Sequence, residues 1–227
     1  MENSWDFIIS KNPMIQKIWD WADKNNISDL EWIAHDSYLK GGYFRGLPRD
    51  KESLLGLQEL NLLGSQLSDL PPEIACLKNL KKLYMLGNRL RKLPPETGLL
   101  TQLEELYLAG NQLEELPKEI GSLKNLKLLL LQENRLSGIP REIASLKNLK
   151  TLELGANQLS SLPAEIGQLT NLTKLTFWKN RLSTLPDEIE NLLNLEELDF
   201  TYNRLSLTQG HAQWLDRLMQ KGCCVSI

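Results

Sequence analysis

One phrase returns every 23 residues through most of this chain. Its form is Leu-x-x-Leu-x-Leu-x-x-Asn-x-Leu, and the cleanest copy runs from Leu103 to Leu113. Seven copies are present, and Ser65 replaces the asparagine in the first. A fixed period of this length is typical of repeats that stack on one another as a solenoid. The asparagine position is filled by Asn88, Asn111, Asn134, Asn157, Asn180 and Asn203.

Each repeat divides into a strand half and a turn half. Leucine occupies alternate positions in residues 105–109, which predicts a half-buried strand in every repeat. Apolar residues recur every third position after Pro117, which predicts one or two turns of α- or 3₁₀-helix. Strands stack about 4.8 Å apart, whereas helices are about 10 Å wide. We therefore expect a curved stack with a parallel sheet on its inner side.

The repeated asparagine has a structural explanation. A carboxamide donates and accepts hydrogen bonds at once, so one per repeat can satisfy the buried backbone of neighbouring turns. Ser65, with a shorter hydroxyl side chain, predicts a weaker tie in the first repeat. Thr97 stands where the other turn halves have isoleucine, which predicts a small packing defect.

The turn half carries a specific resemblance. Residues 162–172 read LPAEIGQLTNL and are followed by Leu175 and Phe177. This unit resembles the leucine-rich repeat family, in particular its 23-residue LPxEIGxLxNL subtype, over residues 47–207. The resemblance implies an α/β solenoid with its sheet on the concave face and short α or 3₁₀ turns on the convex face. It also implies protein binding, as in the intracellular signalling scaffolds and bacterial proteins, secreted effectors included, in which the subtype is common.

An open stack needs a cap at each end. We expect a helical N-terminal cap over residues 1–46, a half repeat plus seven copies over 47–207, and a capping helix with a tail over 208–227. The cap should contain a helix from Pro13 to Lys24 and another over 28–34, where Ser28 and Glu31 form a capping pattern. A third helix is expected over 210–220, with a frayed tail beyond it. Aromatic residues that could cover the first repeat, or alternatively bind a ligand, are Trp5, Phe7, Trp19, Trp21 and Trp32.

The last four residues are similar to a C-a-a-X prenylation box at Cys224, with Cys223 placed for a second lipid. Ser226 departs from the usual aliphatic residue, Ile227 is an uncommon last residue, and no polybasic run lies nearby. A single lipid gives only marginal membrane attachment. An unmodified tail and a lipidated tail therefore both remain open.

Composition and charge narrow the class of partner and the cellular compartment that we expect. The net charge of −3 gives no electrostatic reason to expect nucleic acid. Three cysteines, two of them adjacent, do not make a disulfide framework, which favours a reducing compartment. The first residues lack the pattern of a secretion signal, and no segment reaches the ~20 apolar residues that span a bilayer. We expect a cytoplasmic protein, or one in the cytoplasm or at the membrane of a host cell if it is a secreted effector.

Side chains between the buried leucines point toward the concave face, so the sequence identifies that surface directly. Charged or small residues would suit simple solvation there, but the first four repeats supply apolar ones instead. A contiguous apolar patch usually marks an interaction site. The alternative is that aromatic residues and leucine merely favour strands. The predicted patch comprises Leu63, Tyr84, Leu86, Tyr107, Leu128 and Leu130, with Trp178 apart from it.

No residue pattern indicates catalysis or a cofactor. His35 and His211 lie in opposite caps, and neither has metal-ligand spacing with another histidine or cysteine. The sequence therefore predicts a non-enzymatic, monomeric module that binds a protein or peptide on its concave face, without metal or cofactor. The alternatives are a membrane-tethered regulator lipidated at Cys224, and a protein whose concave patch serves self-association.

Overall fold

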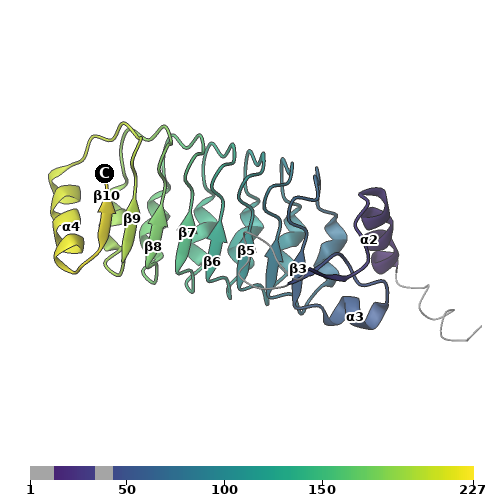
Figure 1. Cartoon of the computed structure of the whole chain (residues 1–227). Helices are drawn as coiled ribbons and strands as arrows, with labels where there is room; N and C mark the ends of the chain where they lie inside the picture. Colours follow the sequence, from purple (N-terminus) through teal and green to yellow (C-terminus); the bar gives the residue numbers. More distant parts are fainter. Residues whose placement is uncertain (1–12, 34–42) are drawn as a thin grey trace, which may run out of the picture.

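The computed structural model describes residues 13–33 and 43–227. From β3 to β9 the chain winds through regular coils, each with one short strand and one 3₁₀ helix (Figure 1). The strands are β3 (Glu59–Asn61), β4 (Lys82–Tyr84), β5 (Glu105–Tyr107), β6 (Leu128–Leu130), β7 (Thr151–Glu153), β8 (Lys174–Thr176) and β9 (Glu197–Asp199). The helices are η1 (Pro72–Cys76), η2 (Pro95–Leu99), η3 (Lys118–Ser122), η4 (Arg141–Ser145), η5 (Ala164–Gln168) and η6 (Asp187–Asn191).

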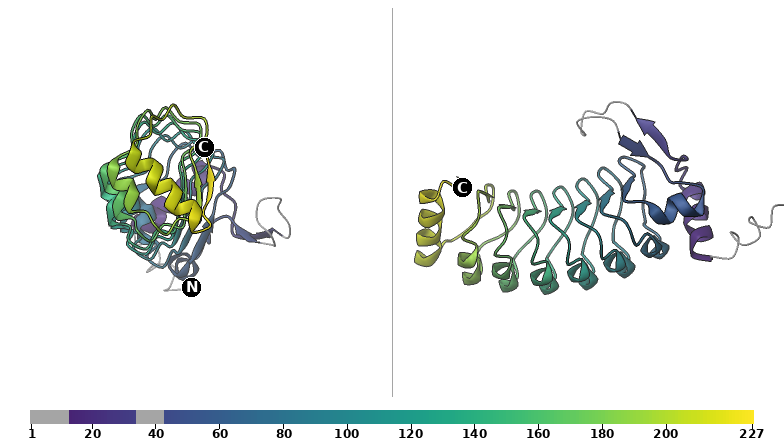
Figure 2. Two further views of the ribbon diagram at one scale, coloured as in Figure 1. Left: turned by 90° about the vertical axis from the view of Figure 1, so that its left-hand side faces the viewer. Right: turned by 90° about the horizontal axis from the view of Figure 1, so that it is seen from below.

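The strands form one open parallel sheet of eight strands in the order β10-β9-β8-β7-β6-β5-β4-β3. Neighbours from β3 to β9 pair at the repeat spacing, so that Leu83 lies beside Leu106 and Leu106 beside Leu129. The 3₁₀ helices line the outer side of a shallow arc (Figure 2). The predicted solenoid, with its sheet on the concave side, is confirmed.

The turn half is 3₁₀ rather than α-helical because its bonds span three residues. In η3 the amide of Ile120 donates to the Pro117 carbonyl at 3.0 Å, and that of Leu123 donates to Ile120 at 3.1 Å. Proline before or at the first helical position removes an amide that would otherwise lack a partner. The helix then ends after five residues, where the chain must return to the sheet.

Leucines from strands β3–β9 fill the interior. Each fully buried leucine contributes about 1.5–3 kcal/mol relative to an exposed one. Because the same side chains recur in every coil, the core runs unbroken along the solenoid. The central leucines, all fully buried, are Leu60, Leu83, Leu106, Leu129, Leu152, Leu175 and Leu198.

The predicted asparagine ladder is present. Asn134 Oδ1 accepts a hydrogen bond from the Leu113 amide at 3.0 Å, while its Nδ2 donates to the Leu108 and Leu131 carbonyls at 3.0 Å. The other five asparagines repeat this arrangement. Ser65, at the N-terminal end of the column, accepts instead from Arg45 at 3.5 Å. The ladder therefore ties each turn to the one before it.

One of the two predicted helices of the N-terminal cap is correct. Helix α2 (Pro13–Lys24) packs beside η1 and buries its apolar face. The indole of Trp21 donates to Asp69 Oδ1 at 3.0 Å, and that of Trp19 donates to the Pro48 carbonyl at 2.9 Å. These two tryptophans cover the first repeat, as predicted. Trp5 and Phe7 lie outside the described residues, as does the side chain of Trp32.

The second predicted helix, over 28–34, is wrong. Residues Glu31–Ile33 form strand β1, which pairs antiparallel with β2 (Tyr43–Arg45). Pairing with a distant segment outweighs the local capping pattern, although Ser28 Oγ still donates to Glu31 at 3.4 Å. This hairpin projects from the N-terminal end on the same side as the sheet (Figure 2). A short helix follows, α3 (Lys51–Gly56), capped by Asp50.

The C-terminal cap differs from prediction in its last residues. Helix α4 (Gln209–Gln220) closes the final coil and buries Trp214, as predicted. The expected frayed tail, however, forms β10 (Cys224–Ser226), which extends the sheet beside β9. Its pairing places Val225 beside Leu198, so the tail supplies an apolar residue in register with the core. The sheet thus gains an eighth strand beyond the seven repeats.

Candidate partner-binding surface

Strands β3–β9 line the concave side of the solenoid (Figure 1). Their outward side chains, with the residues just beyond each strand, form its concave wall. Because the strands pair in register, equivalent side chains stand in columns about 4.8 Å apart. The first column is Glu59, Lys82, Glu105, Leu128, Thr151, Lys174 and Glu197, and the second is Asn61, Tyr84, Tyr107, Leu130, Glu153, Thr176 and Asp199.

Strand β6 gives the wall an apolar centre. Both of its outward side chains, Leu128 and Leu130, are half-buried and retain surface open to solvent. Tyr107 is half-buried beside Leu130 on the neighbouring strand. Leu63 and Leu86, just beyond β3 and β4, are also half-buried. Strand pairing thus brings these predicted patch residues together on one face.

Tyr84 does not fit the prediction of an accessible anchor. It is only 8% exposed, because its ring stacks on that of Tyr107 with centroids 4.4 Å apart. The hydroxyl of Tyr107 in turn donates to Glu105 Oε2 at 2.6 Å. Burial and this hydrogen bond raise the pKa of Tyr107, so its hydroxyl stays protonated. Tyr107 is therefore the accessible member of the pair, and Tyr84 supports it from below.

A charged group borders the apolar centre on its N-terminal side. The Lys82 ammonium lies 3.4 Å from Glu59 Oε1 and 3.6 Å from Glu105 Oε1. Burial alone would lower the pKa of Lys82, but electrostatic interactions with Tyr84, Glu105 and Glu59 outweigh burial and raise it. One protonated lysine between two glutamates leaves this group, the N-terminal triad, with a net charge of −1.

A second triad borders the centre on its C-terminal side. The Lys174 ammonium lies 3.1 Å from Glu153 Oε1 and 3.0 Å from Glu197 Oε1. Burial opposes the charge of Lys174, but its bonds to both carboxylates outweigh burial and raise the pKa. The C-terminal triad also carries a net charge of −1. Sequence reasoning missed both triads, although the Glu-Lys-Glu order in the first column was a visible signal for the N-terminal one. The C-terminal triad had no such signal, because Glu153 lies in the second column and Lys174 in the first.

Trp178 lies apart from the patch, as predicted, and is half-buried beyond β8. Its indole rests so closely on Gly155 that a Cβ on that glycine would overlap the ring. Gly155 follows Glu153 by two positions, so the indole lies on the same side of the wall as the C-terminal triad. Because Gly155 has no side chain, the Trp178 indole can pack flat against the sheet.

The two C-terminal cysteines differ in their surroundings. Cys223 is only 8% exposed, and burial raises the pKa of its thiol, whereas Cys224 is exposed on β10. Buried Cys223 is a poor acceptor for the second lipid that the tail motif would need. Among the described residues, no cluster of three or more histidine, cysteine or acidic side chains could hold a metal ion. Helices long and apolar enough to cross a membrane are likewise absent from 13–33 and 43–227.

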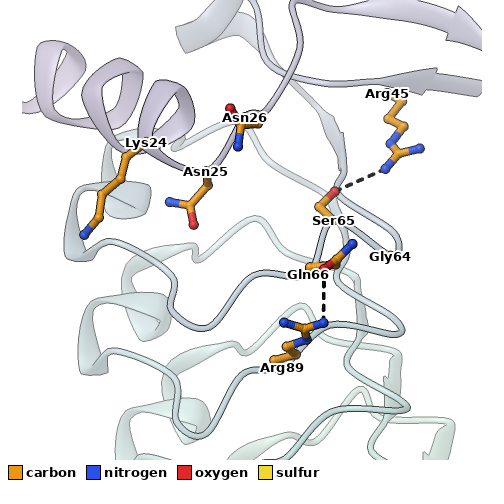
Figure 3. Close-up of a pocket in the computed structure, with 8 residues that line it drawn as sticks. All are labelled: Lys24, Asn25, Asn26, Arg45, Gly64, Ser65, Gln66 and Arg89. Atoms are coloured by element: carbon orange, nitrogen blue, oxygen red, sulfur yellow. Dashed lines mark hydrogen bonds between the residues drawn. The ribbon is translucent and has the colours of Figure 1, made fainter.

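A polar pocket of about 450 Å³ opens where α2 meets the first turn, and Figure 3 shows its lining. Arg89 donates to Gln66 Oε1 at 3.0 Å, and Arg45 donates to Ser65 at 3.5 Å. Lys24, also in the lining, extends away from both arginines (Figure 3). These cations do not converge on one point, so we assign no ligand to the pocket.

Comparisons with known proteins agree with the geometry. A family model described as a leucine-rich repeat region matches residues 115–220, and one for two copies of leucine-rich repeats matches residues 78–118. No curated protein matches the chain.

Solved structures are also similar to this chain, including those of two proteins with leucine-rich repeats. A leucine-rich repeat protein of Leptospira interrogans is 38% identical with a TM-score of 0.69, and the match covers 76% of this chain and 43% of that one. The leucine-rich repeat ectodomain of the plant membrane receptor kinase GASSHO1/SCHENGEN3 from Arabidopsis thaliana, solved in complex with Casparian strip integrity factor 2, is 33% identical with a TM-score of 0.63. That match covers 67% of this chain and 19% of the ectodomain. Both relatives are thus much longer than the part that this chain spans.

Proposed function

The chain belongs to the leucine-rich repeat family, and we propose that it is a non-enzymatic recognition module that holds a protein or peptide partner on its concave wall. The apolar centre carries this proposal. Tyr107, Leu128 and Leu130 stand side by side on adjacent strands, where solvation alone would favour polar residues. Binding by the plant receptor's ectodomain, solved with its partner, supports the same use of the fold.

The wall supports binding better than it supports chemistry. Six of its charged side chains are paired in the two triads, Asp199 accepts hydrogen bonds from Thr201, and the tyrosines stay protonated. Such a surface offers apolar contact area flanked by fixed charge, which suits an adaptor that positions a partner.

The test compares partner capture by wild-type protein and two wall variants. We expect Tyr107→Ala with Leu130→Ala, and separately Leu128→Asn, to lose the partners that wild-type protein captures from a lysate of the source cells. Leu128→Asn keeps the branching and the number of side-chain heavy atoms and leaves the tyrosine stack in place. The two variants therefore test the wall independently, even if one of them does not fold. Circular dichroism should show that both variants stay folded.

The matched control is Leu99→Ala. Leu99 is an exposed leucine at the end of η2, on the convex side, so its removal should leave capture unchanged. Recovery of the same partners from both wall variants, at wild-type yield, would mean that recognition uses another surface.

A further inference from the structure

The concave wall has a pattern of charge that defines its partner more closely. The two triads are centred on Lys82 of β4 and Lys174 of β8, with the apolar strand β6 midway between them. Along the sheet, a negatively charged triad is therefore followed by an apolar strand and then by a second negatively charged triad.

The carboxylates are the part of each triad that a partner would meet. The side chains of Glu59 and Glu197 are 58% and 47% exposed, whereas those of Lys82 and Lys174 are 34% and 32% exposed. Each lysine is already shared between two glutamates, so each triad has negative charge left to bind a cation. Asp199 adds a further carboxylate to the wall beside Glu197.

Aromatic rings accompany both triads. The stacked Tyr84 and Tyr107 adjoin the N-terminal triad, where Tyr107 bonds to Glu105. The Trp178 indole, on Gly155, lies on the side of Glu153. A carboxylate with an aromatic face beside it suits an ammonium or guanidinium group, which gains both ionic and cation–π contacts.

From this arrangement we infer that the partner is an extended peptide segment with an apolar centre and one lysine or arginine on each side, lying across the strands. This inference rests on the proposed function. Six strand intervals separate β3, which carries Glu59, from β9, which carries Glu197, and this is roughly 29 Å at about 4.8 Å per interval. At about 3.3 Å per residue, the two basic residues stand about nine positions apart.

The rim of the wall limits where these basic residues can lie. Arg89, Arg135, Arg181 and Arg204 are exposed in the turns beyond the carboxyl ends of the strands, so the rim is positively charged. A basic side chain is repelled from the rim and attracted to the strand positions. Charge thus sets the placement of the segment, while the leucines supply contact area.

The experiment selects binders from a random library of displayed 12-residue peptides on the full chain. We expect enrichment of apolar sequences that carry two basic residues eight to ten positions apart. A synthetic copy of the best peptide should bind more weakly as salt rises, and moving its basic residues to three positions apart should weaken binding about tenfold. Selected peptides that are acidic, or that show no paired basic residues, would overturn the inference.

Variants separate the charge inference from the proposed function. Glu59→Gln and Glu197→Gln should each weaken binding of the synthetic peptide about threefold. The double variant should weaken it about tenfold, because the two sites are too far apart to influence one another. The matched controls, Glu119→Gln and Glu165→Gln, change carboxylates on convex turns and should have no effect. If the Leu128→Asn variant lost the peptide but the Glu59 and Glu197 variants kept it, the charge inference would fail and recognition by the wall would stand. A library that yields no binder would count against both.

Discussion

At the scale of single residues, Thr97 departs most from its equivalents in the other repeats. The equivalent side chains in η1 and η3 are Ile74 and Ile120, both fully buried. Thr97 is equally buried, and its hydroxyl has no hydrogen-bond partner among the described residues. A buried hydroxyl without a partner costs about 1–3 kcal/mol.

We therefore expect Thr97→Ile to stabilise the protein by about 1–2 kcal/mol, because it removes that hydroxyl and restores the apolar contact of the other repeats. The urea midpoint measures the change. Ile120→Thr, the reverse substitution one repeat later, should destabilise the protein and serves as the control. A lower midpoint for Thr97→Ile would show that the site has shrunk around threonine and is overpacked by isoleucine.

The position of some wall residues could be predicted from the sequence, whereas the burial of others could not. Strict alternation in the strands placed Leu128 and Leu130 on the wall, because side-chain direction follows from position alone. The burial of Tyr84 was not predictable in that way, since it depends on how two rings stack across neighbouring strands. The triads depend likewise on which lysine reaches which glutamate. The column order indicated only the N-terminal triad, because Glu153 and Lys174 lie in different columns.

At the scale of elements, local patterns succeeded where a helix carries its own signal. Helices α2 and α4 lie where the sequence predicted helices over 13–24 and 210–220. The hairpin β1–β2 and strand β10 were missed, because each depends on pairing with a segment distant in sequence. Three-residue strands of this kind carry little periodic signal of their own.

The reactivity of the cysteine thiols tests whether the last residues form strand β10 or a frayed tail. With a thiol reagent near neutral pH, Cys224 should react fastest and Cys223 slowest, because burial both shields Cys223 and raises the pKa of its thiol. Cys76 should be intermediate to slow, since partial burial raises its pKa as well. Peptide mapping after timed quenching measures the three rates. In urea the differences should vanish, and equal native rates for the adjacent pair would mean that β10 does not form.

At the scale of the whole molecule, each coil contacts only the coils beside it. Stability is then close to a sum of local terms, and the ends should open more readily than the middle. The asparagine ladder acts in the same nearest-neighbour way, since each carboxamide bonds to its own turn and the preceding coil. Figure 1 shows that both ends are closed by different elements, α2 at one and α4 with β10 at the other. The caps therefore control local opening at each end separately.

Hydrogen exchange on Trp214→Ala tests this independence. Trp214 is fully buried in α4, and its indole donates to the Leu192 carbonyl at 3.2 Å. Replacing it with alanine should lower the free energy of local unfolding at the C-terminal end by about 3–5 kcal/mol. We expect protection of the amides in β9 and β10 to fall by roughly a hundredfold or more, while β4 and β5 keep their wild-type rates. In the wild-type chain β6 and β7 should exchange most slowly. A uniform loss of protection from β3 to β10 would instead mean that the solenoid opens as a single cooperative unit, because a local defect would then weaken every strand equally.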